Sequence, residues 1–178
     1  MPEVVLGQNI YLKPMTFRDI SDRIKWFNIE NSWQLIENPN AEIKEVVPWK
    51  YFCKQIKAIV IKKKKVNGIW YAMEIYTKDK VHIGFLNCFP ITLNSYNLTM
   101  ALGLILPSEN NRNHGFGTEA LNVYINYLKN NGIKSFCWIV NSKNTISKHI
   151  AEKCGFKKWF YNESTDEMYY VKKEELAC

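Results

Sequence analysis

Apolar positions near the start of the chain predict a short strand followed by a helix. Residues Asn9–Lys13 form a strand pattern that Pro14 ends. Thr16 marks the start of a helix, because Asp19 follows three residues later in the place of a capping-box acid. The apolar residues of this helix keep helical spacing and are Phe17, Ile20, Ile24 and Phe27.

The next part of the chain combines an irregular stretch, a helix and a hairpin. The stretch Asn28–Pro48 has no clear period, so a short helix and a loop both remain open. Pro48 suits the first turn of a helix through residues 49–63, which an Asn-Gly pair then ends. Two strand patterns, Ile69–Tyr76 and Val81–Phe89, flank a polar turn and predict a β-hairpin.

The third part is a long strand, a polar loop and a helix. The strand Tyr96–Leu106 is almost continuously apolar and contains Gly103, and an interior glycine indicates a bulge or a close approach to the backbone. The helix covers Phe116–Asn130 and ends at an Asn-Gly pair. Its inward residues are Leu121, Tyr124, Ile125 and Leu128.

The last part repeats the alternation of strands and helices. Ser135–Val140 predicts a buried strand, and Asn144 caps a helix that ends at Cys154. Two strand patterns near the C-terminus form a closing hairpin. The order predicts an α/β or α+β fold, in which helices cover the faces of one sheet.

Composition narrows the class of protein. A chain of 178 residues with 47% apolar and 23% charged residues is typical of one globular domain, here residues 1–178. Five cysteines without a C-x-x-C pair, and no metal-like spacing of His, Cys and acids, argue against disulfides or zinc and favour a reducing cytoplasm. The N-terminus has no leader pattern, and no apolar run is long enough to span a membrane.

The charge of the chain indicates an anionic partner. A formal net charge of +7 favours a phosphorylated cofactor, a nucleic acid or an acidic protein surface. The run Lys62–Lys65 is most simply a solvated helix end. No regular stripe of basic and stacking aromatic residues is present, so we expect neither a nucleic acid nor a membrane as partner.

The loop RNHGFG, residues 112–117, is the best candidate for binding a phosphate group. Free amides at a helix start bind anions, and Gly115 and Gly117 let the backbone approach a ligand closely. Arg112 adds a positive charge. The loop matches neither the Walker pattern nor the three-glycine dinucleotide pattern.

The loop and a later motif together resemble a known family. R-x-x-G-x-G between a long strand and a helix, followed by NTISKHIAEKCGF, is similar to the acyl-CoA signature of the GNAT superfamily of N-acetyltransferases. The N-terminal YLKPMTFRDISDRIKWFN and the N-x-x-S and EK-x-GF elements look most like the RimJ and RimL branch, which acetylates ribosomal proteins at their N-termini. The resemblance implies a mixed, mostly antiparallel sheet of about seven strands with helices on both faces and a splayed, bulged strand.

The resemblance also implies how acetyl-CoA is held. The amides of residues 113–118 would bind the pyrophosphate beside Arg112, and the pantetheine arm would pair with the end of the long strand. Asn144 and Ser147 would lie near the thioester. The implied cofactor residues are Leu104, Ile105, Leu106, Arg112, Asn113, His114, Gly115, Phe116, Gly117, Thr118, Asn144 and Ser147.

Two familiar catalytic side chains of such enzymes are absent. Ala101 stands where many relatives carry a glutamate base, and Ala151 stands where others carry a tyrosine acid. Ser147 is the remaining candidate acid. The alternative is a structural role, in which the hydroxyl of this serine donates a hydrogen bond to the Lys143 carbonyl. Glu163 is a weak candidate base and Glu74 a weaker one, because both residues are predicted to be solvated acids. Water is the alternative base. His82, His114 and His149 read as ordinary strand, loop and helix-surface residues.

The predicted function is acetyl transfer from acetyl-CoA to a primary amine by direct attack on the thioester. The N-terminal α-amine of a protein or peptide is the leading acceptor, because a basic chain suits an acidic partner. A small amine such as an aminoglycoside, polyamine or amino acid is the alternative, and a non-catalytic CoA-binding or basic interaction module is a third. A monomer and a homodimer are both compatible with the sequence.

Overall fold

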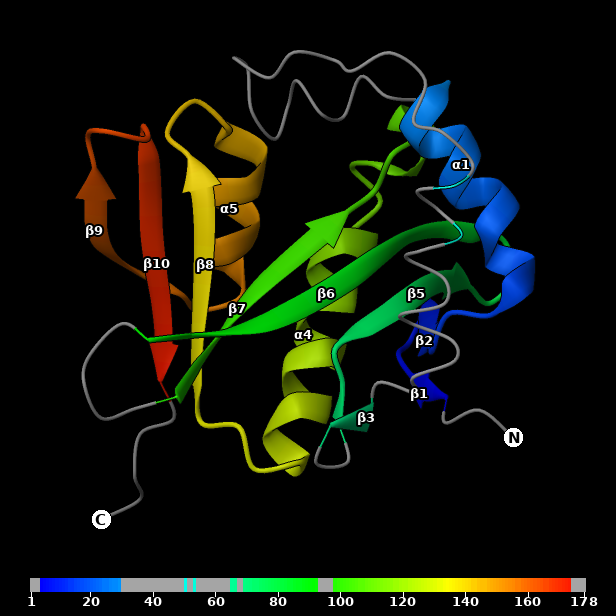
Figure 1. Cartoon of the computed structure of the whole chain (residues 1–178), viewed down its shortest axis with the longest axis horizontal. Coiled ribbons are helices and arrows are strands. Elements are labelled where there is room, and N and C mark those ends of the chain that lie inside the picture. The colour runs from blue at the N-terminus through cyan, green and yellow to red at the C-terminus, as the bar shows by residue number, and fades with distance from the viewer. Residues whose placement is uncertain are drawn as a thin grey trace.

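An eight-stranded sheet with helices on both faces forms the described part of the chain (Figure 1). The computed structural model describes residues 4–29, 50, 53, 65–66, 69–92 and 98–173. The strand order is β1-β2-β5-β6-β7-β8-β10-β9, and β3 and β4 pair separately. The α/β fold class is therefore confirmed, with one strand more than expected, because the two-residue β1 is too short to leave a pattern in the sequence.

The elements follow the predicted order. The strands are β1 (Val5–Leu6), β2 (Ile10–Lys13), β3 (Lys65–Val66), β4 (Ile69–Trp70), β5 (Ala72–Thr77), β6 (His82–Thr92), β7 (Leu98–Ile105), β8 (Ser135–Asn141), β9 (Lys157–Asn162) and β10 (Glu167–Lys173). The α-helices are α1 (Ile20–Asn28), α4 (Phe116–Asn130) and α5 (Thr145–Lys153), and the short 3-10 helices are η1 (Phe17–Asp19) and η3 (Glu109–Asn111).

The sheet divides at the junction of β7 and β8. Every strand pair is antiparallel except this one, which is parallel. The parallel pairing covers Met100–Leu102, whereas β7 continues to Ile105. The two strands therefore separate after Leu102, and Figure 1 shows the arrow of β7 turning away from β8.

The main core lies between the sheet and the two helices on its rear face, α4 and α5. The four predicted inward residues of α4 are all buried: Leu121, Tyr124, Ile125 and Leu128. The same cluster contains three alternate residues of β8, because alternate side chains of a strand point to the same face of the sheet. These residues are Phe136, Trp138 and Val140. The helical spacing of the apolar residues therefore predicted both α4 and its buried side.

The first turn of α4 is tied to the N-terminal hairpin of β1 and β2. Glu119 Oε1 accepts hydrogen bonds from the amides of Asn9 at 2.7 Å and Ile10 at 3.3 Å. Burial would raise the pKa of Glu119, but the hydrogen bonds from Asn9 and Ile10 outweigh it and lower that pKa. The charged carboxylate thus stabilises a contact between segments more than one hundred residues apart.

Several details differ from the sequence predictions. The predicted strand Ile69–Tyr76 is divided between β4 and β5, because its first two residues pair with β3. Phe17 is 65% exposed, since it lies in the 3-10 turn before α1 and not in the helix itself. The irregular stretch 32–48 lies outside the described residues, as does the second helix apart from Lys50 and Cys53, which are helical.

The glycine in the long strand makes room for a side chain from the neighbouring strand. β6 and β7 keep an unbroken register through Gly103, so the predicted bulge there is wrong. The predicted close approach is confirmed, because the side-chain oxygen of Asn87 lies 2.2 Å from where a Cβ of Gly103 would stand. Any other residue at position 103 would displace Asn87.

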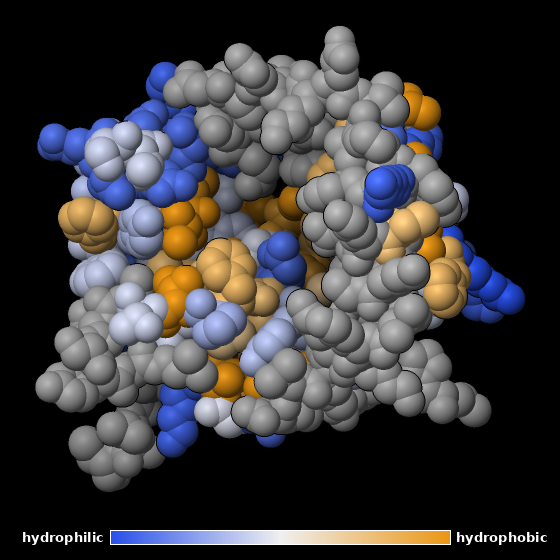
Figure 2. Space-filling view, in the orientation of Figure 1, coloured by the Kyte–Doolittle hydropathy of each residue, from blue (hydrophilic) through white to orange (hydrophobic). Residues whose placement is uncertain are grey.

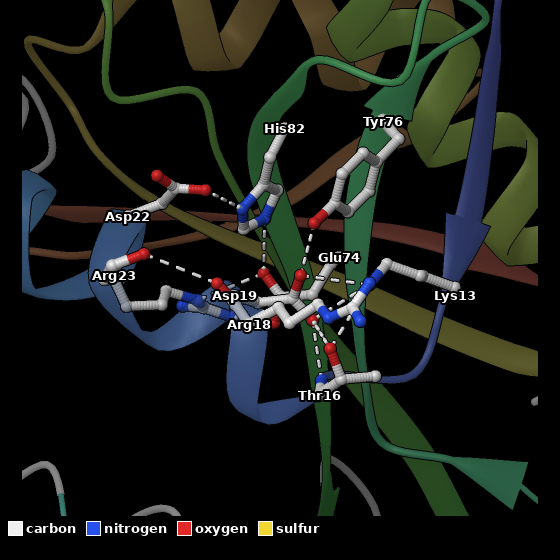
Figure 3. Close-up of polar contacts among 10 residues, drawn as sticks. Lys13, Thr16, Arg18, Asp19, Asp22, Arg23, Glu74, Tyr76 and His82 are labelled. Atoms are coloured by element: carbon white, nitrogen blue, oxygen red, sulfur yellow. Dashed lines mark hydrogen bonds and ion pairs between the residues drawn. The ribbon is translucent and has the colours of Figure 1, made fainter.

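A buried polar cluster joins α1 to the front face of β5 and β6 (Figure 3). The side chain of Glu74 is fully buried and accepts hydrogen bonds from Arg23 Nε at 3.1 Å and Nη2 at 2.7 Å. His82 contacts Glu74 with Nε2 and Asp22 with Nδ1, each at 2.8 Å. The prediction that Glu74 is solvated was wrong. The sequence pattern did not reveal its burial, because its partner Arg23 is distant in sequence. His82 is also more than an ordinary strand residue.

The capping box at the start of η1 belongs to the same cluster. Asp19 accepts hydrogen bonds from the Thr16 amide at 2.6 Å, from Lys13 Nζ at 2.9 Å and from the Tyr76 hydroxyl. Burial would raise the pKa of Asp19, but hydrogen bonds from Tyr76, Thr16 and Lys13 outweigh it and lower that pKa. The predicted capping box is confirmed, and it also fixes the helix to the sheet.

Membrane insertion has no support in the helices of the described part, none of which is long and apolar enough to span a bilayer.

Replacing Glu74 tests how much the buried cluster contributes to stability. Glu74→Ala leaves Arg23, whose side chain is 13% exposed, without its charged partner, so we expect the free energy of unfolding to fall by about 3 kcal/mol. Urea unfolding followed by circular dichroism measures this change. Glu163→Ala removes an exposed carboxylate and should change stability by less than about 0.5 kcal/mol. Equal losses in the two variants would contradict the assignment.

Candidate functional site

A cavity of about 280 Å³ opens where β7 and β8 separate. Its lining comes from the end of β7, the loop after it, the first turn of α4, β8 and α5. The lining residues are Leu104, Ile105, Leu106, Asn111, Arg112, Asn113, Gly115, Phe116, Gly117, Thr118, Trp138, Asn144, Ile146, Ser147, His149, Ile150 and Lys153. The structure therefore brings together every predicted cofactor residue except His114, and it does not bring Glu163 to the cavity.

One wall of the cavity is the edge of β7 that β8 leaves unpaired. The pairing with β8 stops at Leu102, and Leu104–Leu106 then line the cavity. Backbone amides and carbonyls on such an edge need hydrogen-bond partners. A linear ligand that carries amide groups can supply them in the manner of an added strand.

The start of α4 forms another part of the wall, next to the end of β7. Gly115 is the N-cap with φ +80°, and no atom lies within 4 Å of where its Cβ would stand. A Cβ on Gly117 would lie 3.2 Å from Leu104 Cδ2, so the helix start packs closely against the end of β7. The first residues of α4 line this space, and the unpaired amides of a helix N-terminus can bind an anion.

Arg112 shapes the loop that carries these amides. Its Nε donates to the Leu106 carbonyl at 3.2 Å and its Nη2 to the Pro107 carbonyl at 2.9 Å. The side chain thus closes the loop between β7 and α4 while its charge stays at the cavity. His114 is exposed, and its ring packs 5.7 Å from that of Phe116, which fits the prediction that only its backbone matters.

The inner end of the cavity holds a chain of hydrogen bonds. Asn144 Oδ1 accepts from the Ser147 amide at 3.0 Å, which confirms the predicted helix cap. Ser147 Oγ accepts from Trp138 Nε1 at 2.9 Å. Among the described residues, no hydrogen bond joins the Ser147 hydroxyl to the Lys143 carbonyl, so the predicted back-bonded arrangement is not found. The Asn144 amino group and the Ser147 hydroxyl hydrogen remain for a ligand.

The positions of the two missing catalytic side chains are filled by packing. Ala101 is 1% exposed and Ala151 is fully buried, so the structure has an apolar, buried side chain at each of these places. Glu163 is exposed in the turn between β9 and β10. The described part of the chain thus provides no carboxylate in the lining of the cavity.

The cysteines near this region are not nucleophiles. Burial raises the pKa of Cys137 to about 12. Burial likewise raises the pKa of Cys154 to about 11, although Lys172 opposes this effect. Both thiols are therefore protonated at neutral pH, which disfavours a covalent acyl-cysteine step. In the described ranges, no group of three His, Cys, Asp or Glu residues forms a metal site.

The sequence analysis missed several lining residues. Trp138 lies in a strand that was predicted only to be buried, and its hydrogen bond to Ser147 leaves no trace in the apolar pattern. His149 and Lys153 were detectable, because they follow Ile146 at helical spacing on the side of α5 that faces the cavity. His149 is exposed on the surface of α5, as predicted, and it also lines the cavity.

Comparison with known proteins gives the same result as the geometry. The sequence matches the acetyltransferase (GNAT) domain family over residues 9–157. No curated protein matches the chain in sequence at a significant level.

Among similar structures is an acetyltransferase of the GNAT family from Bacillus anthracis, with a TM-score of 0.73 at 13% identity, covering 96% of this chain and 98% of that one. RimL, a ribosomal L7/L12 α-N-protein acetyltransferase solved with coenzyme A, has a TM-score of 0.74 at 15% identity, with coverage of 96% and 98%. A spermidine N-acetyltransferase from Vibrio cholerae, solved with CoA and spermine, has a TM-score of 0.67 at 14% identity, with coverage of 93% and 95%.

Identities this low establish the fold, whereas the family match rests on the sequence itself and covers most of the chain. The cavity beside the unpaired end of β7, with a glycine-containing helix start as its other wall, fits a pantetheine arm and a pyrophosphate. The chain belongs to the GNAT acetyltransferase family and is an acetyl-CoA-dependent N-acetyltransferase.

Proposed function

We propose that the chain acetylates the N-terminal α-amine of a protein or peptide. The observation that carries this proposal is the neutral strip of β6, β8 and β10 on the front face, beside the separation of β7 and β8. Both RimL and the Vibrio cholerae spermidine enzyme share the fold, so the fold alone does not distinguish a protein acceptor from a polyamine. The chemistry of the front face favours a protein acceptor.

The middle of the front face is neutral and partly apolar in the described strands. Asn87 is exposed and Phe89 is 50% exposed on β6, while Ile139 and Tyr169 are half-buried on β8 and β10. Figure 2 shows apolar, weakly polar and hydrophilic residues beside a hollow in the middle of this face. A peptide backbone and an apolar side chain fit such a surface.

A polyamine or aminoglycoside needs carboxylates around its cationic groups. The described acid at the start of β10, Glu167, already accepts a hydrogen bond from Thr165 at 2.8 Å. Glu74 is buried against Arg23 and is not available to a ligand. The net charge of +7 also favours an acidic partner protein over a small cation.

Three groups of residues have separate roles in the proposed reaction. The amides at the start of α4 bind the pyrophosphate, with the charge of Arg112 close by. The edge of β7 and the Asn144 amino group bind the amides of the pantetheine arm. When bound, acetyl-CoA supplies an activated carbonyl and a thiol leaving group.

Ser147 is the proposed acid, and its hydroxyl would donate to the leaving sulfur. Acetyl transfer removes one proton from the amine and adds one to the sulfur, so the two changes balance. Ser147 Oγ would hold the proton that the leaving sulfur needs and would regain one from water, and water would also accept the proton of the amine. No described carboxylate lines the cavity, so water serves as the base in place of the predicted Glu163.

The buried, free cysteines support a reducing, cytoplasmic setting.

The cofactor site is tested by two glycine variants with the same backbone strain. Gly115 and Gly132 both have positive φ and open space at the Cβ position, at opposite ends of α4. Acetyl-CoA should raise the melting temperature of the wild type, and the indole of Gly115→Trp should abolish this shift by occupying the pyrophosphate position. Gly132→Trp should keep it. The cofactor site is refuted if millimolar acetyl-CoA leaves the wild-type melting curve unchanged.

Ser147→Ala tests the proposed acid. We expect kcat to fall by about 100-fold, the scale of general acid catalysis, while KM for acetyl-CoA changes by less than about threefold. Steady-state kinetics with thiol detection measures both constants. Ser164→Ala, which alters an exposed serine in the turn between β9 and β10, should retain full kcat. Full kcat in Ser147→Ala would leave this serine with a structural role.

The acceptor is identified by a screen with isotopically labelled acetyl-CoA. Peptides with a free N-terminus should gain the label at the α-amine, as mass spectrometry with fragmentation can show. The same peptides with a blocked N-terminus serve as controls and should not react. Labelling of polyamines or aminoglycosides but not of peptides would favour the small-amine alternative, and labelling of neither would favour a non-catalytic module.

A further inference from the structure

Trp138 lies at the point where β7 and β8 separate, directly beside the candidate acid. Its Cα pairs with Leu102 in the last bridge between the two strands and with Tyr170 on β10. The indole is 3% exposed and packs against the Phe156 ring at 6.3 Å. The ring therefore has a fixed orientation at the inner end of the cavity.

The hydrogen bond between Trp138 and Ser147 has only one possible direction. An indole N–H donates and cannot accept, so Ser147 Oγ is the acceptor in the 2.9 Å contact. The hydroxyl hydrogen must then point elsewhere. The Ser147 amide is itself taken by Asn144, and within the described residues Ser147 Oγ has no other protein partner.

The remaining direction for the Ser147 hydroxyl hydrogen is the cavity. Ser147 is 8% exposed, and its side chain lines the same cavity as Trp138 and the unpaired end of β7. A donor on the far side of a hydroxyl also polarises it, because hydrogen bonds in series strengthen one another. Trp138 thus affects both the direction and the acidity of the Ser147 hydroxyl.

We propose that Trp138 is a positioning residue, which orients the Ser147 hydroxyl as a donor toward the leaving sulfur through the bond from Nε1 to Oγ. This inference rests on the proposed role of Ser147. It adds that an indole, and not merely a large apolar side chain, is required at position 138. A phenylalanine there would fill most of the same volume but would leave Ser147 free to rotate.

The test is a double-mutant cycle of Trp138→Phe and Ser147→Ala. Trp138→Phe should lower kcat by about tenfold, the scale of one hydrogen bond, with KM for acetyl-CoA within about twofold of the wild type. The double variant should have the same kcat as Ser147→Ala, because the indole acts only through the serine. Trp159→Phe is the matched control, since Trp159 is 48% exposed on β9 and should leave both constants unchanged.

The melting temperature of the variants is a second readout, which a purely catalytic effect of the substitutions would not change. Ser147→Ala leaves the buried Trp138 N–H without an acceptor, which should lower the melting temperature. Adding Trp138→Phe removes that unpaired donor and should restore part of the loss.

The proposal is overturned if Trp138→Phe keeps full kcat, or if the two substitutions lower kcat multiplicatively. Full kcat in Ser147→Ala would overturn it together with the proposed acid. The measurements use whichever amine the wild-type enzyme acetylates. A wrong prediction of the acceptor therefore leaves this test intact, and the two failures are distinguishable.

Discussion

The backbone of β7 beyond Leu102 has hydrogen-bonding groups that β8 does not reach, and the catalytic half of the molecule depends on this constraint. Unpaired groups inside a protein must find water, a side chain or a ligand. The separation opens the cavity, exposes a strand edge to it and places the start of α4 on the other side. The close packing of Gly117 on Leu104 keeps that helix start near the edge.

The two faces of the sheet have different roles. The rear face carries the apolar core with α4 and α5, so the helix starts that meet the cofactor are held by burial of apolar surface. The front face carries α1 through a charged cluster centred on Glu74, next to a neutral strip of β6, β8 and β10. Buried ion pairs fix geometry more than they add stability, and here they fix the helix beside the proposed acceptor side.

The sequence predicted well what depends on local periods and caps, and poorly what depends on distant partners. The bounds of α4 and the cap at Asn144 follow from spacing alone, and the structure has them where expected. The burial of Glu74 was not predictable, because Arg23 lies 51 residues away and a single acid in a strand looks solvated. The hydrogen bond from Trp138 to Ser147 was not predictable for a similar reason, since a tryptophan in an apolar strand indicates burial and not a donor.

The tie between Glu119 and Asn9 has a consequence for how the chain folds. The two residues are 110 positions apart, so β1 and β2 lack this anchor until α4 has been synthesised. Contacts of such long range slow folding, because a large loop must close before they form. During translation, β1 and β2 therefore gain this contact only after α4, the helix that begins at the cofactor loop, has been synthesised. The N-terminal edge and the cofactor site should thus become ordered together, late in folding.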